Sequence, residues 1–312
     1  MSSNQDNTVE HEEYYVPEQS KLPIFASIGL FLTVWGAANW LNGDANGPMY
    51  FFAGSLMFAF VLWNWFSIVI SENIQGLNSP QLKKSYVIGM AWFIFSEVMF
   101  FAAFFGALFY VRSLAGPWLA GEGEQGLGND LIWPGYEHEW PVMTTPDMAA
   151  NGDSATMRGP EQNMSNPGLA NWLGWLPFWN TAILLTSSVT CHIAHGALKK
   201  DNRRQFNIWL GLTVLLGIAF IILQIEEYVH AYNEMGLTLE SGIYGATFFL
   251  LTGFHGAHVT LGTFMLLVMF LRSVLKGHFK SDDHFGFESA SWYWHFVDVV
   301  WVGLFLYVYV FG

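Results

Sequence analysis

The sequence has little charge. Only 12% of its 312 residues are Asp, Glu, Lys or Arg, about half of the roughly 25% found in soluble domains. Hydrophobic residues make up 53% of the chain and aromatic residues 18%, with 28 Phe and 15 Trp. This composition argues against an ordinary soluble domain and indicates a membrane protein, in which Trp favours the interfaces.

Basic residues and cysteines are scarce as well. The net charge of −13 argues against a nucleic-acid-binding protein, which needs basic patches. The single cysteine, Cys191, cannot form an internal disulfide. The first 20 residues are polar and acidic and lack the apolar segment of a cleavable signal peptide. We expect residues 1–22 to form a polar, exposed N-terminal arm.

The sequence contains several long runs of apolar residues. About 20 apolar residues span the hydrocarbon core of a bilayer, and seven stretches meet this length. They cover approximately residues 24–41, 49–70, 86–111, 173–198, 207–232, 243–271 and 291–311. The predicted fold is therefore an all-α membrane domain over residues 23–312 with seven transmembrane helices. One long connection, 112–172, is rich in Gly, Pro and acidic residues and is predicted to be an irregular extracytoplasmic loop.

The distribution of Lys and Arg predicts the orientation. Ten of these 12 residues fall before the first helix or in the alternate connections on the same side of the membrane. They are Lys21, Lys83, Lys84, Lys199, Lys200, Arg203, Arg204, Arg272, Lys276 and Lys280. Only Arg112 and Arg158 fall on the other side. The positive-inside rule then predicts a cytoplasmic or matrix-side N-terminus and a C-terminus outside.

A few ionisable residues lie inside the predicted helices. Glu97 stands in FIFSEVMFFAAFF, a run with no other charged side chain. At a rise of about 1.5 Å per residue, it falls near the middle of the third helix. Polar groups at this depth must face the bundle and find partners there. We predict a buried polar layer between the third, sixth and seventh helices. Its members are Glu97, His255, His258, His295 and Asp298.

Three interpretations of this layer are open. The three-residue spacing of His192 and His195, and of His255 and His258, invites a di-metal or haem site, although neither an HExxH motif nor a cysteine ligand set accompanies it. A proton or ion path through this chain would use Glu97 as a carrier. The third interpretation is structural, with hydrogen bonds between neighbouring helices.

Longer motifs point to a family. They are SEVMFF at 96–101, Asn180–Thr181 followed by Leu-Leu, Gln224 with Glu227–Tyr228, SGIYGATFF from Ser241, TGFHGAHVTLG from Thr252 and DHFGFESASWYWHFVDVVWVGLF from Asp283. In their order, spacing and helix count they resemble subunit III of the haem-copper oxidases, in the cytochrome c oxidase branch. The resemblance is strong over the third to seventh helices, whereas the first two match by pattern.

This resemblance implies an accessory subunit that carries no haem and no copper. It would pack beside catalytic subunit I and subunit II in a complex that reduces O2 to water with electrons from cytochrome c and pumps protons. The family's third subunit supports proton uptake and protects the catalytic subunit during turnover. Its two-helix and five-helix parts form a V-shaped cleft that holds phospholipid. We expect a bacterial plasma membrane rather than the mitochondrial inner membrane. The alternatives are a quinol oxidase subunit III, whose members generally lack the first two helices, and a stand-alone transporter or histidine-metal enzyme.

Candidate lipid contacts lie near the inner ends of two helices. Arg272, Lys276 and His278 follow the sixth helix and suit lipid phosphates, and Trp65 lies near the end of the second helix. These residues equally suit ordinary positive-inside anchors.

Two features depart from the family pattern. Trp65-Phe66-Ser67-Ile68 stands where the family usually has Trp-Arg-Asp. The loop at 112–172 is extended, and its eight acidic residues against two Arg would suit steering of a basic cytochrome c or cover of a neighbouring subunit.

Overall fold

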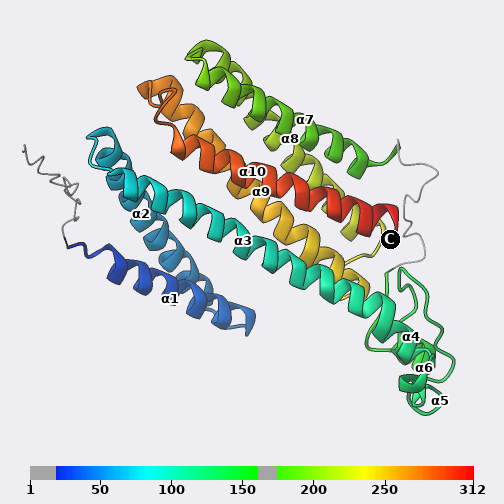
Figure 1. Ribbon diagram of the computed structural model, residues 1–312. Coiled ribbons are helices and arrows are strands. Elements are labelled where there is room, and N and C mark those ends of the chain that lie inside the picture. Colours follow the sequence, from blue (N-terminus) through cyan, green and yellow to red (C-terminus); the bar gives the residue numbers. More distant parts are fainter. Residues whose placement is uncertain (1–18, 161–173) are drawn as a thin grey trace, which may run out of the picture. The chain divides into compact units, whose positions relative to one another are not determined.

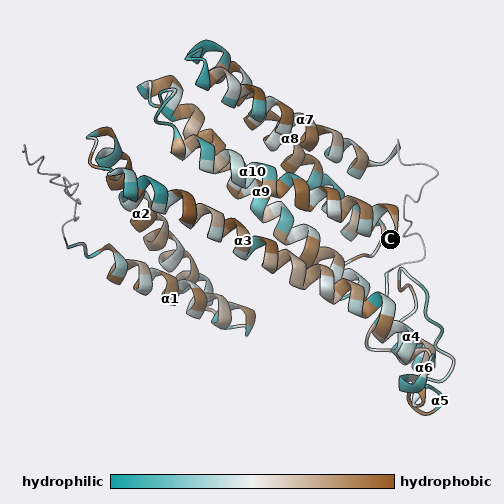
Figure 2. Ribbon diagram, viewed as in Figure 1, coloured by the Kyte–Doolittle hydropathy of each residue, from teal (hydrophilic) through white to brown (hydrophobic). Residues whose placement is uncertain are grey.

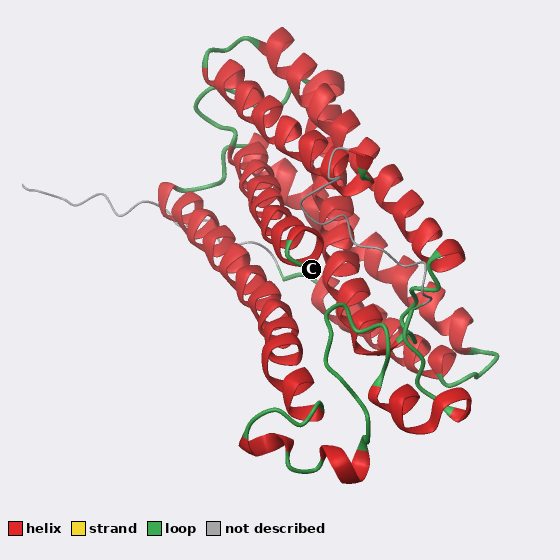
Figure 3. Ribbon diagram, turned by 90° about the vertical axis from the view of Figure 1, so that its right-hand side faces the viewer, coloured by secondary structure: helices red, strands yellow, loops and turns green. Residues whose placement is uncertain are grey.

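The computed structural model describes residues 19–160 and 174–312. Most of the predicted arm at 1–22 therefore lies outside the described residues. Within the described part, secondary structure is helical throughout, as Figure 3 shows. Seven of these helices are long and apolar enough to cross a membrane, which confirms the predicted all-α fold with seven transmembrane helices.

The seven long helices have clear starts and stops. They are α1 (Leu22–Leu41), α2 (Gly47–Ile74), α3 (Pro80–Tyr110), α7 (Leu176–Lys199), α8 (Arg203–Glu234), α9 (Gly242–Lys276) and α10 (Phe285–Leu304), which continues into η5 (Phe305–Val310). Pro23, Pro48 and Pro177 stand in the first turns of their helices, where a missing N–H costs no helical hydrogen bond. Gly277 ends α9 in the left-handed region, with φ 62°.

The chain divides into two compact units, Met1–Gly89 and Met90–Gly312. The first unit holds α1 and α2, which pack closely because glycines lie between them. A Cβ added at Gly36 would lie 2.1 Å from the backbone nitrogen of Phe51, and one at Gly54 would lie 2.4 Å from that of Thr33. Such backbone approach is typical of small residues between membrane helices. The V-shaped cleft stays a prediction.

The second unit contains α7, α8, α9 and α10, which lie side by side (Figure 1). Helix α7 contacts α8 and α10, and α9 contacts the same two helices. Large side chains fill the core of this unit. The largest fully buried ones include Trp294, Trp301, Tyr293, Phe101, Phe206 and Phe220. On the outside, hydrophobic residues cover the long helices (Figure 2); along α8, for example, Ile208, Ile222 and Ile225 are exposed, as lipid contact requires.

The segment after α3 differs from the prediction of an irregular loop from residue 112. The helix continues through η1 (Val111–Ala115) and α4 (Gly116–Leu119), since Pro117 stands in the first turn of a new helix, where it is tolerated. Short helices follow: η2 (Glu124–Gly126), α5 (Asn129–Ile132), α6 (Pro146–Asn151) and η3 (Gly152–Ser154). Residues 161–173 of the predicted loop lie outside the described part.

Candidate functional site

Glu97 and His258 form a pair between α3 and α9, both within the second unit. The Glu97 carboxyl Oε2 lies 3.0 Å from His258 Nε2, and the side chains are 21% and 15% exposed. Aromatic rings surround the imidazole, with Phe101 at 4.9 Å edge-on and Tyr293 stacked at 6.3 Å between centroids. The Glu97 carboxyl, inside the apolar run of α3, thus has a partner on α9.

The hydrogen bond of the second ring nitrogen of His258 limits where the protons of this pair can lie. His258 Nδ1 lies 2.6 Å from the carbonyl oxygen of Phe254, so this nitrogen carries a proton and donates it. In a neutral imidazole Nε2 is then an acceptor, and the carboxylic acid of Glu97 must donate to it. In a charged imidazolium Nε2 donates to the Glu97 carboxylate instead. Either way the pair shares one exchangeable proton.

His255 occupies a different environment from His258, although both lie on α9. It is fully buried, and its Nε2 lies 3.2 Å from the carbonyl oxygen of Val297 on α10. The ring packs 4.9 Å from Trp301 and 5.8 Å from Phe220. Its Nδ1 has no hydrogen-bond partner among the described residues. This histidine therefore joins α9 to α10 inside an aromatic core.

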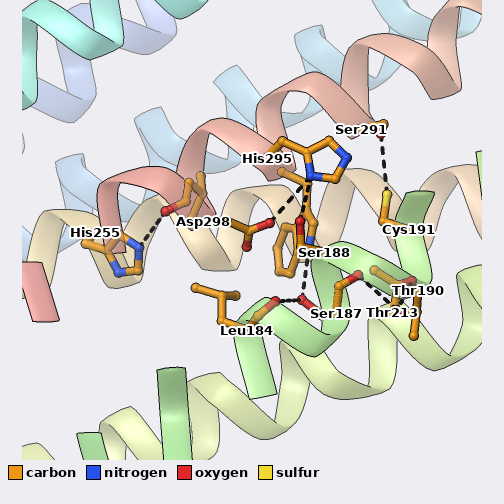
Figure 4. A network of polar contacts seen from close by, with 12 residues as sticks. Leu184, Ser187, Ser188, Thr190, Cys191, Thr213, His255, Ser291, His295 and Asp298 are labelled. Carbon is orange, nitrogen blue, oxygen red and sulfur yellow. Dashed lines mark hydrogen bonds and ion pairs between the residues drawn. The ribbon is translucent and has the colours of Figure 1, made fainter. Parts of the chain in front are cut away.

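His295 and Asp298 lie three residues apart on α10. His295 Nδ1 lies 3.6 Å from Asp298 Oδ2, an ion-pair distance that is too long for a hydrogen bond. The same nitrogen lies 2.8 Å from the hydroxyl of Ser188 on α7 (Figure 4). Asp298 is buried, at 4% exposure. The group is thus an α7–α10 contact.

The predicted layer consequently falls into separate groups. Glu97 pairs with His258, His255 bonds to a backbone carbonyl, and His295 lies between Ser188 and Asp298. Figure 4 shows His255, which projects from α9, apart from the group around His295 on α10. Within residues 19–160 and 174–312, hydrogen bonds between side chains do not link the Glu97 pair to the His295 group. The five residues share one part of the bundle as local pairs.

Sequence reasoning left the partners on α7 out of the polar layer, since it considered Thr181 and His195 for other reasons and did not single out Ser188. Thr181, Ser188 and His195 are seven residues apart and so share one face of the helix. Trp301 Nε1 donates to the Thr181 hydroxyl at 2.9 Å, and His195 Nε2 lies 3.3 Å from His284 Nε2. The seven-residue spacing of these polar residues was the signal in the sequence.

The two histidine pairs do not gather into a larger ligand set. His192 is exposed, while His195 faces His284. His255 and His258 point to different partners. Among the described residues, groups of three or more His, Cys, Asp or Glu with the geometry to hold a metal ion do not occur.

The inner lipid candidates cluster around the end of α9. Arg272 lies over the Phe279 ring at 4.7 Å, and its Nε donates to His278 Nδ1 at 3.4 Å. Burial, and after it the positive charge of Arg272, lowers the pKa of His278, so this imidazole is neutral near pH 7. Lys276 is exposed. Trp65 belongs to the other unit, where it is 54% exposed and stacks on Phe66.

Comparison with known proteins identifies the family. A family profile described as "Cytochrome c oxidase subunit III" matches residues 11–156 and 171–312. The chain belongs to the cytochrome c oxidase subunit III family. The "Probable cytochrome c oxidase subunit 3" of Rickettsia felis is 34% identical over 320 residues, the full length of both chains.

Animal relatives match over nearly the same length. The "Cytochrome c oxidase subunit 3" of Hippopotamus amphibius is 35% identical and that of Coturnix japonica 36% identical, each over 300 residues, 96% of this chain and 97% of the relative. The protein is thus a multi-pass membrane subunit of cytochrome c oxidase, an oxidoreductase complex of several subunits. The profile match omits residues 157–170, which lie in the connection between α3 and α7.

Proposed function

We propose that this chain is the accessory third subunit of an oxidase that takes electrons from cytochrome c, reduces O2 to water and pumps protons. In this proposal haem and copper reside in catalytic subunit I and in subunit II, and the chain itself carries no redox centre. Its role is to support proton uptake by subunit I and to stabilise that subunit during turnover. In this proposal the chain contributes to the reaction by supporting proton uptake and by binding phospholipid.

The observation that carries this proposal is the pair of Glu97 and His258. A carboxyl and an imidazole 3.0 Å apart within membrane-spanning helices hold one exchangeable proton, and the shared proton can sit on either group. Such intramembrane ionisable pairs are typical of proton-handling sites. His295 and Asp298 form a second ionisable contact in the same unit.

Phospholipid binding is the second part of the proposal. Arg272 and Lys276 provide positive charge at the inner end of α9, next to His278, which accepts a hydrogen bond from Arg272. Lipid phosphates are attracted to such juxtamembrane basic residues, and Trp65 would lie at the same interface from α2. The ten basic residues on this side support a cytoplasmic N-terminus and an outer C-terminus. The acidic first 20 residues and the enlarged loop at 112–172 favour a bacterial plasma membrane.

The test separates this chain from its partners. The tagged chain is extracted in mild detergent, and the visible spectrum and metal content are recorded before and after the partner subunits are stripped away. We expect haem and copper to purify with the complex and to leave with the larger subunits. Iron or copper that stays with this chain at near one equivalent would overturn the accessory role and favour a histidine-metal enzyme. Oxidation of quinol but not cytochrome c by the complex would favour the quinol oxidase.

A further inference from the structure

A cavity lies at the end of the second unit where α7 begins and α8 ends. Its volume is about 400 Å³, within the range of roughly 300–1,000 Å³ typical of small-molecule sites. Residues from α8, α9 and η5 provide the acidic, imidazole and aromatic side chains of its lining. They include Glu226, Glu227, His230, Tyr244, Phe248 and Tyr309. The cavity is far along α9 from the inner lipid candidates, since Tyr244 and Phe248 stand at the start of this helix and Arg272 at its end.

The charge of the cavity favours a cation. Among the described residues that line it, two are carboxylates and none is Lys or Arg. The only basic side chain, His230, is engaged with Glu234, since its Nδ1 lies 3.0 Å from Glu234 Oε2. Gln224 Nε2 donates to Glu227 Oε2 at 2.9 Å and so holds this carboxyl in place. An anionic ligand would meet repulsion here without a compensating charge.

Aromatic rings form one wall of the cavity. Tyr244 stacks on Phe248 with centroids 6.3 Å apart, and Phe248 meets Tyr309 edge-on at 5.9 Å. Tyr309 is 4% exposed, and its hydroxyl bonds to the Glu227 carboxyl. Buried hydroxyls in folded proteins are nearly always paired. Gln224 and Tyr309 together hold the Glu227 carboxyl beside the aromatic wall.

We propose that this cavity binds an organic ammonium group. Aromatic faces attract such cations, the Glu227 carboxylate supplies the opposite charge, and the apolar wall suits the carbon substituents of the nitrogen. Two sources share this chemistry: the headgroup of a choline or ethanolamine phospholipid, and a free small amine. The position at the ends of membrane-spanning helices is the depth at which headgroups lie. The inference does not depend on the oxidase role proposed above.

The test uses the intact oxidase, purified through a tag on this chain and washed free of loosely held lipid. Choline is added, and saturation transfer from the protein to its methyl protons is measured by NMR. In a second arm, the lipid retained after washing is compared for equal mixtures of phosphatidylcholine and phosphatidylglycerol. Glu227→Gln is expected to weaken choline binding about tenfold, because the neutral amide no longer attracts the positive charge of the quaternary ammonium. Phe248→Leu, which keeps the carboxyl, is expected to weaken it about threefold. Glu240→Gln, an exposed carboxyl in the α8–α9 connection that is not part of the lining, serves as the control.

The two arms distinguish the source. Choline binding without preferential retention of phosphatidylcholine supports a free amine, and preferential retention that Glu227→Gln or Phe248→Leu removes supports a lipid headgroup. The proposal is overturned if wild-type protein neither binds choline nor prefers phosphatidylcholine, or if Glu227→Gln and Phe248→Leu bind like wild type. Density for a lysine of a neighbouring subunit inside the cavity of the intact complex would overturn it as well.

Discussion

The Glu97 carboxyl shares a proton with His258 within the membrane-spanning part of the chain. In Glu97→Gln the amide donates to His258 Nε2 in place of the carboxylic acid, because Nδ1 already donates to Phe254. We therefore expect assembly and haem content to be unchanged. Steady-state oxygen consumption should fall only modestly, far less than the roughly 100-fold loss typical for a catalytic acid or base. Glu240→Gln, in the exposed α8–α9 connection, is the control, and loss of all haem in Glu97→Gln would contradict the proposed role.

Ser188 positions His295 from the neighbouring helix. Ser188→Ala removes the 2.8 Å hydrogen bond to His295 Nδ1 and leaves Asp298 as the remaining side-chain contact, at 3.6 Å. We expect a loss of about 1 kcal/mol in stability, measured as a lower midpoint for release of this subunit on heating. Thr186→Ala is the matched control, since Thr186 is exposed and bonds only within α7, to the carbonyl of Ala182. Equal effects of both substitutions would show that the contact to His295 contributes nothing.

Asp147 stabilises the connection between α3 and α7 through its charge. Its carboxylate accepts hydrogen bonds from Met157 N at 2.8 Å, from Asn151 Nδ2 at 2.7 Å and from Thr156 N at 2.7 Å. These bonds, the one from Met157 first, lower the pKa of Asp147 to about 2. Because the folded-state pKa lies below the ordinary value of 3.8, this stabilisation is fully present above about pH 4 and is lost as the pH falls through about 2.

The measurement for Asp147 is hydrogen exchange at the amides of Thr156 and Met157. Wild-type protection is expected to hold from pH 7 down to pH 4, after correction for the intrinsic exchange rate. Asp147→Asn should lower it severalfold throughout this range, because a neutral amide is the weaker acceptor. A wild-type loss of protection with its midpoint near pH 4 would contradict the assignment.

At the scale of elements, the pairing of α1 with α2 depends on glycine. Gly36→Ala places a methyl group against the backbone of Phe51, at 2.1 Å from its nitrogen, and backbone cannot move aside as a flexible side chain does. We expect a loss of about 1–3 kcal/mol in the stability of the first unit, measured by unfolding in sodium dodecyl sulfate. Gly89→Ala is the control, because nothing lies within 4 Å of its added Cβ and alanine favours the helix. A Gly36→Ala protein as stable as the control would disprove the close approach.

At the scale of the whole molecule, the distribution of basic residues predicts the orientation. A Cys191→Ser background removes the single buried cysteine. In it, Lys84→Cys introduces one thiol on the exposed start of α3, and Leu131→Cys introduces one in the α3–α7 connection. An impermeant maleimide added to intact spheroplasts should label Leu131→Cys, whose site is 87% exposed, and leave Lys84→Cys unlabelled until the membrane is opened. The reverse pattern would invert the topology.

The sequence by itself determined the number of helices and their approximate bounds, because the hydrocarbon thickness imposes about 20 apolar residues on each span. The motifs of α3, α9 and α10 determined the family. Glu97, His258, His295 and Asp298 were identified as candidates because charge inside an apolar run is conspicuous. Only the tertiary structure determined which partner each of these side chains has. Spacing places His255 and His258 on one side of α9, but their partners lie on α10 and α3, 42 and 161 residues away in the chain. Only packing brings such distant residues within hydrogen-bond distance, and for the same reason the acidic, aromatic cavity around Glu227 became visible only in three dimensions.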